Sequence, residues 1–260
     1  MKKVIRWILN RVPRRHIQRV VPVIVPLLEA LYVGRKIECP VCRGHFRTFL
    51  PYGYGSAVRE NALCPRCLAL ERHRLMWLYL QRETNLFTAR LRLLHLAPER
   101  CFIKRFEKLL GENYVTGDIE SPLARVKLDI QQMPFTDESF DVIFCNHVLE
   151  HVEDDRQALR EMHRVLRRGG WGMLLAPVNY NRAETFENPS ITDQAGRLAA
   201  FGQPDHVREY GRDYPDRLAE AGFDVLAIDY LRQLETETVT RHALRPEILY
   251  VVRKDGTGKR

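Results

Sequence analysis

The sequence predicts an α/β fold, with a doubly wound, mainly parallel sheet that follows a small cysteine-containing module. Three observations lead to this prediction. From residue 91 onward, short apolar runs alternate with amphipathic segments, as strands joined by crossover helices do. The run 140–145 is apolar throughout its length, which is typical of a strand buried on both faces. Four cysteines stand in two matching pairs ahead of this alternation.

The alternation gives each expected element in turn. Strands are expected at 91–96, 114–118, 126–129, 140–145, 173–177, 223–228 and 248–252, and helices at 68–80, 98–110 and 214–221. The best-defined helix follows the fourth strand. It has Asp154 and Asp155 at its positive N-terminal end and an apolar stripe that reaches Leu166, and we expect the run 167–170, Arg-Arg-Gly-Gly, to close it.

Length and charge suggest three parts. A chain of 260 residues with 45% hydrophobic residues can bury one large core and carry a smaller module. We expect an N-terminal arm at 1–36, a cysteine module with a linking helix at 37–80, and the main domain at 90–260 with an insertion at 178–213. The net charge of +8 comes mostly from seven cations that precede the first acid, Glu29: Lys2, Lys3, Arg6, Arg11, Arg14, Arg15 and Arg19.

The N-terminal arm is not expected to span a membrane. Its apolar run, 20–33, is interrupted by Pro22, Pro26 and Glu29 and is shorter than the roughly 20 residues that a spanning helix needs. No small-residue cleavage site follows it, so we expect a cytoplasmic protein. The basic arm is compatible with contact to anionic lipid at the inner face of the membrane, with RNA, or simply with solvent ahead of a packing helix.

The four cysteines predict a zinc site. Cys39, Cys42, Cys64 and Cys67 form two Cys-x-x-Cys pairs, and two such pairs supply the four thiolates of a closed tetrahedral zinc centre. Zinc would then hold residues 37 to 70 folded, because so short a segment buries little core by itself. Two disulfides are the alternative, and a reducing compartment disfavours them.

Acidic residues follow two of the predicted strands, at the edge where such folds bind ligands. Asp118 ends the second strand 21 residues after Ala97, the place where an acid binds a ribose diol. Asp129 ends the third strand, where it would accept from an adenine amino group while Ile130 or Met133 packs on the ring. Each acid taken alone is equally well explained as a helix cap or a solvated strand end.

The segment 128–152 carries the pattern "D…MPF.D.SFD.I…..LEHV", and an "LR.GG" run precedes the fifth strand. Over residues 90 to 178 the chain resembles class I S-adenosylmethionine-dependent methyltransferases of the type 11 group, which includes quinone-biosynthesis enzymes. The resemblance implies a Rossmann-like, seven-stranded methyltransferase sheet with a zinc ribbon ahead of it. It also implies a set of donor-binding residues: His95, Ala97, Pro98, Glu99, Asp118, Ile119, Asp129, Ile130, Gln132, Asn146 and His147.

The first corner of the sheet departs from the family pattern. Ala97, Pro98 and Glu99 replace the usual glycine-rich turn. S-adenosylmethionine has no phosphate to cradle, so we expect Ala97 to allow close approach, Pro98 to take the first helical position and Glu99 to face the donor's ammonium group. A nicotinamide dinucleotide would need the missing glycines for its pyrophosphate.

The acceptor side is expected in the segment 178–213, which is too long for a plain connection. His206 beside Asp205 is the candidate general base, because histidine titrates near the working pH and a hydroxyl acceptor would need a base. The alternative is that His206 only forms hydrogen bonds within its own loop and takes no part in catalysis. His147 and His151 stand nearer the expected donor, and His151 is interpreted as structural.

Three functions remain open. The favoured one is methyl transfer to a small molecule or glycan. The second is an RNA methyltransferase, because a zinc ribbon ahead of such a domain also resembles some ribosomal RNA guanine methylases and the basic arm suits phosphates. The third is a non-catalytic binding module on a degenerate fold. Salt-dependent RNA binding would favour the second, and failure to bind the donor would favour the third.

Overall fold

The structure is a computed structural model and describes residues 24–53 and 58–255. Two compact units divide the chain. Unit 1 contains the residues up to Phe87 together with Glu99–Lys104 and Tyr230–Glu247. Unit 2 contains Thr88–Pro98, Arg105–Asp229 and the residues from Ile248 onward. The seven cations of the basic arm lie outside the described residues, and the domain limits 1–36, 37–80 and 90–260 remain predictions.

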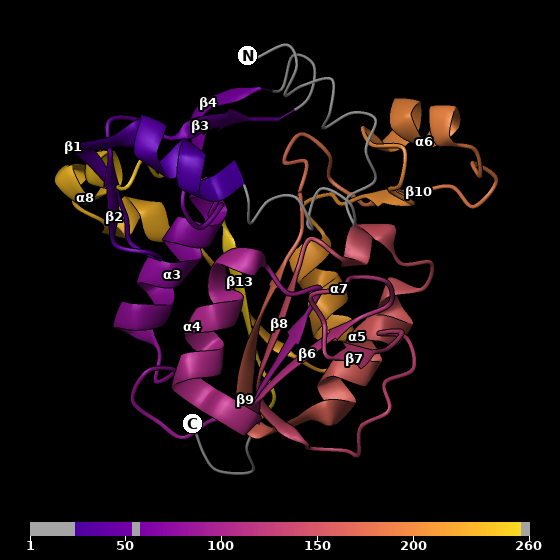
Figure 1. Cartoon of the computed structure of the whole chain (residues 1–260). Coiled ribbons are helices and arrows are strands. Elements are labelled where there is room, and N and C mark those ends of the chain that lie inside the picture. The colour runs from indigo at the N-terminus through magenta and orange to yellow at the C-terminus, as the bar shows by residue number, and fades with distance from the viewer. Residues whose placement is uncertain (1–23, 54–57, 256–260) are drawn as a thin grey trace. The chain divides into compact units, whose positions relative to one another are not determined.

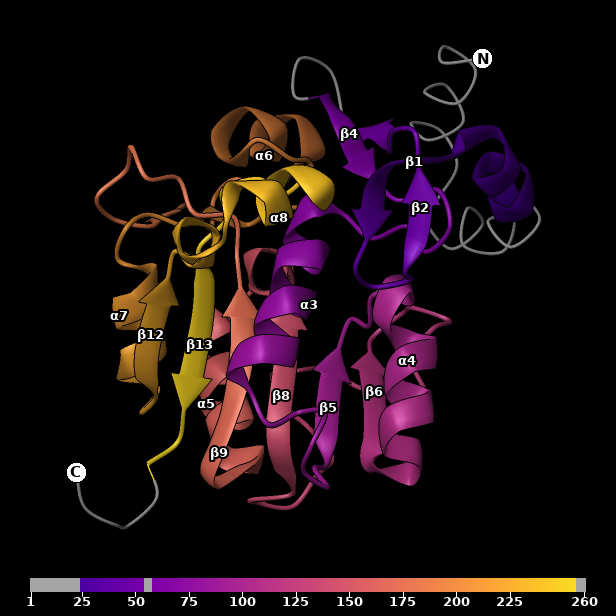
Figure 2. The same ribbon diagram turned by 90° about the vertical axis from the view of Figure 1, so that its left-hand side faces the viewer.

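Unit 2 is built on a seven-stranded sheet with the order β12-β13-β9-β8-β5-β6-β7, whose face Figure 2 shows. The pairs of β5 with β6 and β8, of β6 with β7 and of β8 with β9 are parallel, and β12, β13 and β9 pair antiparallel. The predicted α/β fold class with a seven-stranded Rossmann-like sheet is confirmed. The strands are β5 (Leu93–Leu96), β6 (Tyr114–Asp118), β7 (Val126–Lys127), β8 (Phe140–Asn146), β9 (Leu166–Leu175), β12 (Asp224–Ile228) and β13 (Leu249–Arg253).

The central strands form because their side chains are apolar on both faces. All four residues of β5 are buried, as are six of the seven in β8, which is the pattern of a parallel strand covered on both sides. The aromatic rings of Phe106, Tyr114 and Phe144 pack around His95 at centroid distances of 5.9–6.1 Å. The core of unit 2 therefore lies on the central strands β5, β6 and β8.

Helices α5 (Asp155–Val165) and α7 (Tyr214–Glu220) run along one face of this sheet (Figure 1). The helix α5 begins where Asp154 accepts a hydrogen bond of 2.8 Å from the amide of Gln157, which satisfies one of the free amides of the first turn. Its buried stripe contains Ala158, Leu159, Met162 and Val165, as predicted. Shorter elements complete unit 2: η2 (Gly111–Asn113), η3 (Leu149–His151), β10 (Phe186–Glu187), α6 (Gln194–Phe201) and β11 (Arg208–Glu209). The helix α4 (Arg100–Leu110) begins in unit 1 and ends in unit 2.

The predicted end of the helix before β9 is wrong. The helix α5 ends at Val165, and the run 166–170 already belongs to β9 instead of closing the helix. Glycines in this run allow β9 to lie close to β8. A Cβ atom at Gly172 would lie 2.6 Å from the carbonyl oxygen of Ile143 in the neighbouring strand. At Gly170 a Cβ atom would lie 2.9 Å from the carbonyl oxygen of Asp141. The strand expected at 173–177 therefore starts earlier, and the close approach to β8 explains both glycines.

Unit 1 carries the cysteine module. The strands β1 (Val33–Cys39) and β2 (Gly44–Phe46) form one antiparallel pair, and β3 (Leu50–Tyr52) and β4 (Arg59–Leu63) form another. Helix α3 (Glu71–Glu83) begins three residues later than predicted. Residues 24–32 are helical, and the segment after residue 229 adds η4 (Tyr230–Gln233) and α8 (Thr236–Arg241). None of the helices within residues 24–53 and 58–255 is long and apolar enough to span a membrane.

One buried arginine joins the parts of unit 1. Arg74 is fully buried, and its guanidinium lies 4.3 Å from the centre of the Phe49 ring. It donates hydrogen bonds of 2.7–2.9 Å to four carbonyl oxygens, those of Ala62, Ala69, His242 and Ala243. These bonds satisfy the buried charge. They also explain why the segment 230–247 belongs to the same unit as the cysteine module.

Candidate functional site

The parallel strands of unit 2 bring the predicted acids to one edge of the sheet. Asp118 is the last residue of β6, Asn146 is the last of β8, and Ala97 follows β5 directly. Asp129 lies two residues beyond β7, in an isolated bridge with Gln132. Because β8, β5, β6 and β7 are neighbours and run in the same direction, these strand ends form a continuous edge. This is where ligands bind in open α/β sheets.

Both acids stabilise local turns. The Oδ1 atom of Asp118 accepts hydrogen bonds of 2.7 and 2.6 Å from the amides of Glu120 and Ser121. In the same way the Oδ1 atom of Asp129 accepts a bond of 2.8 Å from the amide of Gln131. A carboxylate accepts about four hydrogen bonds, so this role leaves capacity for a ligand. The turns account for part of the residue choice at both positions.

The other residues implied for the adenosine differ in their exposure. The side chain of Ile119 is 56% exposed immediately after Asp118. Gln132 is exposed, whereas Ile130 is buried. An exposed isoleucine at the sheet edge offers an apolar surface for a flat ring, while Ile130 packs into the protein. Ile119 is therefore the better placed of the two isoleucines for such a contact.

Ala97 adopts a left-handed backbone conformation, which glycine takes more readily than alanine. Its φ angle is +46° and its amide donates a hydrogen bond of 2.8 Å to the carbonyl oxygen of Gly117. This left-handed region disfavours residues that carry a Cβ atom. The expectation that Pro98 occupies the first helical position is wrong, because α4 begins at Arg100. Glu99 belongs to unit 1, where its Oε1 atom lies 3.8 Å from Nε2 of His73.

His95 is a core residue. Its imidazole is fully buried, and Nδ1 lies 2.8 Å from the hydroxyl oxygen of Tyr114. The strand β5 alternates its side chains between the two faces of the sheet, which directs the ring of His95 away from the strand's end. At the sheet edge, His95 can therefore contact a bound S-adenosylmethionine only through its backbone.

A group of titratable side chains follows the end of β8, and we call His147, Glu150, His151 and His206 the histidine cluster. His147 has a φ angle of +55°, and its Nδ1 lies 3.4 Å from Oε1 of Glu150. The rings of His151 and His206 meet edge to face at 4.8 Å. One donor atom each of Glu150, His151 and His206 lies within 4.8 Å of the other two.

Burial and neighbouring charges shift the pKa of Glu150 in opposite directions. Glu150 is 2% exposed, and burial opposes its ionisation, but the hydrogen bond with His147 and the charges of His147 and His151 lower its pKa below the usual value. Burial lowers the pKa of His206, which favours the neutral imidazole. The cluster thus combines an ionised carboxylate with a neutral ring nitrogen at the sheet edge.

The partners of the candidate base differ from those expected. Oδ2 of Asp205 lies 3.6 Å from Nδ1 of His151, and its main-chain oxygen lies 3.1 Å from the same nitrogen. Asp205 therefore contacts His151, for which the sequence predicts a structural role. Sequence reasoning missed Glu150 and His151 as members of the site. The available signal was the His-x-x-Glu-His spacing of residues 147–151.

A buried arginine holds the cluster together. Arg208 is 2% exposed and donates to the carbonyl oxygens of Leu149, Val152 and Glu153, with distances of 2.6 Å to Leu149 and 2.8 Å to Glu153. The amide of Val207 donates a bond of 2.9 Å to the carbonyl oxygen of Glu150. The turn that carries Glu150 and His151 is thereby tied to the segment that carries His206.

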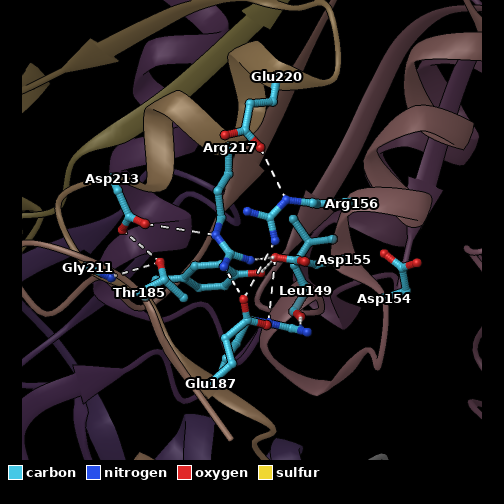
Figure 3. A network of polar contacts seen from close by, with 12 residues as sticks. Leu149, Asp154, Asp155, Arg156, Thr185, Glu187, Gly211, Asp213, Arg217 and Glu220 are labelled. Atoms are coloured by element: carbon cyan, nitrogen blue, oxygen red, sulfur yellow. Dashed lines mark hydrogen bonds and ion pairs between the residues drawn. The ribbon is translucent and has the colours of Figure 1, made fainter. Parts of the chain in front are cut away.

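Arg208 belongs to a larger ionic network, and Figure 3 labels its members Asp155, Glu187 and Arg217. Asp155 accepts hydrogen bonds of 2.7 Å from the hydroxyl of Tyr210 and 2.8 Å from Arg217. Arg217 also pairs with Glu187, which lies 3.0 Å from Nε of Arg208. The network joins β10, β11 and α7 to the start of α5. The predicted acceptor segment 178–213 is therefore held in place by a charged network in which Asp155, Arg208 and Arg217 are buried and Glu187 is partly exposed.

Substituting Glu187 by glutamine is expected to lower stability at neutral pH. Burial opposes ionisation of Glu187, but hydrogen bonds from Arg217 and Arg208 outweigh it and lower its pKa. This stabilisation is complete above the unfolded-state pKa of about 4.3 and is lost as the pH falls through the lower folded-state value. Urea unfolding of E187Q and the parent should therefore differ by about 1 kcal/mol at pH 7 and converge toward pH 3. Glu220→Gln, at an exposed pair with Arg156, is the control. A pH-independent difference would contradict the prediction.

The four predicted metal ligands come together in unit 1. Their Sγ atoms all lie within 4.8 Å of one another, with 3.6 Å between Cys39 and Cys67 and 3.7 Å between Cys42 and Cys64. A disulfide needs about 2.05 Å, whereas zinc–sulfur bonds of about 2.3 Å place tetrahedral thiolates about 3.8 Å apart. Burial raises the pKa of the Cys39 thiol, and Cys42 and Cys64 add to this effect. The cluster suits a metal ion that favours thiolates.

The two cysteine pairs have the same backbone geometry. Arg43 follows Cys42 with a φ angle of +54°, and its amide donates to the carbonyl oxygen of Cys39 at 2.7 Å. Leu68 follows Cys67 with a φ angle of +63°, and its amide donates to the carbonyl oxygen of Cys64 at 3.0 Å. Each turn therefore directs its two thiols to a common point, as a zinc ribbon requires.

The fold and its strand-end edge define a class I methyltransferase architecture, and comparison with known proteins agrees. A family model described as a methyltransferase domain matches residues 87–174. The methyltransferase YcgJ of Bacillus subtilis is 35% identical over 82 residues, which cover 30% of this chain and 29% of that protein. A ubiquinone/menaquinone biosynthesis C-methyltransferase of Vibrio campbellii is 38% identical over 128 residues, 44% and 48% of the two chains. The solved structure of YcgJ aligns with a TM-score of 0.45 and 19% identity, covering 71% of this chain and 100% of that one.

Residues 87–174 therefore carry a methyltransferase domain, and the predicted resemblance to S-adenosylmethionine-dependent methyltransferases is confirmed. The matched segments span less than two thirds of either relative.

Proposed function

We propose that this protein transfers a methyl group from S-adenosylmethionine to a small-molecule or glycan acceptor. The observation that supports this most is the common edge of the parallel strands β8, β5, β6 and β7 within a methyltransferase domain. Asn146 and Asp118 are the last residues of β8 and β6, and Asp129 lies two residues beyond β7. When bound, S-adenosylmethionine supplies an activated methyl group on a sulfonium. The protein's contribution is then to align the acceptor and exclude water, because the transfer is an in-line displacement.

The proposed donor contacts come from the edge residues. Asp118 would accept from the ribose hydroxyls and Asp129 from the adenine amino group, while Ile119 packs on the ring. Ala97 supports close approach of the methionine part, since its left-handed conformation is that of a glycine-rich corner. Pro98, Glu99, Ile130, Gln132, Asn146 and His147 remain predicted contacts, and His95 contributes only its backbone.

The proposed acceptor contacts come from the segment 178–213 and the histidine cluster. His206 remains the candidate base for a hydroxyl acceptor, and Asp205 acts on the cluster through His151. The four cysteines are proposed to bind zinc as a structural clip, with no ligand position left open for chemistry. Membrane contact through the basic arm and a cytoplasmic location also remain proposals, since residues 1–23 lie outside the described part of the chain.

Substituting Asp118 by asparagine is expected to weaken donor binding ten- to a hundredfold, as loss of a charge-assisted hydrogen bond of roughly 1.5–3 kcal/mol would do. Asparagine keeps an oxygen for the turn that Asp118 stabilises, so the fold should be unchanged. Isothermal titration with S-adenosylmethionine measures the effect. Asp216→Asn, at an exposed position on α7, should bind as the parent does. Tight binding of NAD without S-adenosylmethionine would overturn the methyltransferase proposal.

The acceptor class is tested by incubating the protein with cell extract and radiolabelled donor. Label in small metabolites or glycans supports the proposal, and label in RNA with salt-dependent RNA binding supports the zinc-ribbon RNA methyltransferase instead. Failure to bind the donor at all would leave a non-catalytic binding module.

A further inference from the structure

We propose that Glu150, His151 and His206 form a second metal site, which binds a divalent transition-metal ion such as Zn²⁺ or Mn²⁺. All three lie in unit 2, whereas the four cysteines lie in unit 1. The two sites therefore differ both in their donor atoms and in their place in the fold.

The donor set is one that such ions accept. Two imidazole nitrogens and one carboxylate oxygen lie within 4.8 Å of one another. A His₂Glu set is a recurrent zinc-binding combination, and three protein ligands leave a position for water or substrate. Glu150 and His206 are 2% and 5% exposed, while the side chain of His151 is 28% exposed. The cluster is thus largely desolvated but still open on one side.

Glu150 carries an oxygen that needs a partner. Its Oε1 atom lies 3.4 Å from Nδ1 of His147. Its Oε2 atom is buried, and no residue within 24–53 or 58–255 forms a hydrogen bond with it. A buried carboxylate oxygen without a partner is costly. A cation between Glu150 and the two histidines would satisfy this oxygen, and no other group in the described chain does so.

The Nδ1 atom of His151 has the kind of hydrogen-bond partner that the non-coordinating nitrogen of a metal-binding histidine usually has. Its Nδ1 lies 3.1 Å from the main-chain oxygen of Asp205 and 3.6 Å from the carboxylate of the same residue. Metal-binding histidines commonly donate their other N–H to a carboxylate or a carbonyl oxygen. With Nδ1 engaged in this way, Nε2 is the atom that would bind the metal.

The frame around the site is rigid. Arg208 holds three carbonyl oxygens of the turn 149–153, and the amide of Val207 binds the carbonyl oxygen of Glu150. His206 immediately precedes these two residues in the chain. The ligands from η3 and from the segment before β11 are therefore positioned before any metal arrives, which favours binding.

The site also narrows the acceptor class, on the assumption that the proposed methyl transfer is correct. The cluster follows the end of β8, beside the edge where the donor is proposed to bind. A cation with an open position would bind an acceptor hydroxyl oxygen and lower its pKa, so that the hydroxyl proton passes to water. The resulting alkoxide or phenoxide would form its bond to the methyl group as the sulfonium–methyl bond breaks, which leaves the donor as a neutral thioether. The acceptor is then a hydroxyl compound, and His206 serves as a ligand of the metal, which replaces the role of general base given to it above for a metal-free site.

The test is the number of zinc ions bound by the full-length protein after equilibration with excess Zn²⁺ and dialysis. We expect about two per chain in the parent, and one fewer in both Glu150→Gln and His151→Gln. His151 is partly exposed, so its substitution should leave the fold intact, which circular dichroism checks. His163→Gln is the matched control, because His163 lies in unit 2, packs against Phe223 and has no part in the cluster. It should keep the parent's zinc content.

A parent protein that binds one zinc, or Glu150 and His151 variants that bind as many as the parent, would overturn the proposal. A Cys39→Ser variant should lose a different zinc and keep the one at Glu150. The readout needs no methyl transfer, so its outcome is separate from that of the proposed function. Failure to bind S-adenosylmethionine with an intact second zinc would end the enzyme proposal alone.

Discussion

Cys64→Ser is expected to remove one zinc ion per chain and to unfold the cysteine module. The four thiols lie within 4.8 Å of one another, and each Cys-x-x-Cys pair is held by a turn of the same kind. Loss of one thiol therefore leaves the metal ion with three protein ligands. Structural zinc contributes about 10–16 kcal/mol in small domains, and most of that free energy is folding free energy. The strands β1 to β4 have little core of their own to replace it.

Metal analysis and limited proteolysis measure this effect. The variant should contain one zinc fewer than the parent and be cleaved rapidly within residues 37–67. Cys145→Ala is the matched control, because Cys145 is buried in β8 of unit 2 and should leave the zinc content unchanged. A metal-free parent with two disulfides would contradict the zinc assignment.

Arg208→Met is expected to lower the free energy of unfolding by about 3–5 kcal/mol, the cost of removing one partner from a buried ion pair. The guanidinium is 2% exposed and lies 3.6 Å from Asp155 and 3.0 Å from Glu187. Methionine fills a similar volume but removes the shared cation, so that Asp155 keeps Tyr210 and Arg217 as partners while Glu187 keeps Arg217 and the exposed Arg156. It also leaves the carbonyl oxygens of the turn 149–153 without their donor.

Thermal unfolding should show a melting temperature about 6–20 °C lower for Arg208→Met than for the parent. Arg156→Met is the control in the same network. Arg156 is 46% exposed and pairs with Glu187 and Glu220 at 3.7 and 3.2 Å, and exposed pairs contribute about 1 kcal/mol or less. Equal, small effects of the two substitutions would show that the buried network contributes little.

Much of the fold was predictable because local patterns report it. The apolar run of β8, the stripe of α5 and the two Cys-x-x-Cys pairs are each contained in a few consecutive residues. The misplaced end of α5 has the same origin. A Gly-Gly pair after a helix is the usual stop signal, and here Gly170 and Gly172 instead allow two strands to approach, which no local pattern distinguishes.

The site was predictable only in part. Asp118 and Asp129 follow from the rule that strand ends meet at one edge, and the structure places them there. The core position of His95 depends on the hydroxyl of Tyr114, and the left-handed conformation of Ala97 depends on its bond to Gly117. Neither partner is adjacent in sequence, so the residue type alone did not reveal these roles.

The sequence by itself determined the α/β class, the positions of the main strands along the chain, the methyltransferase resemblance and the identity of the four thiols, because these depend on periodicity and spacing within short segments. Only the tertiary structure brought His206 to Glu150 and His151 and turned Asp205 toward His151. It also buried Arg208 against the turn 149–153. Such contacts join segments far apart in the chain, and their geometry is decided by how those segments pack.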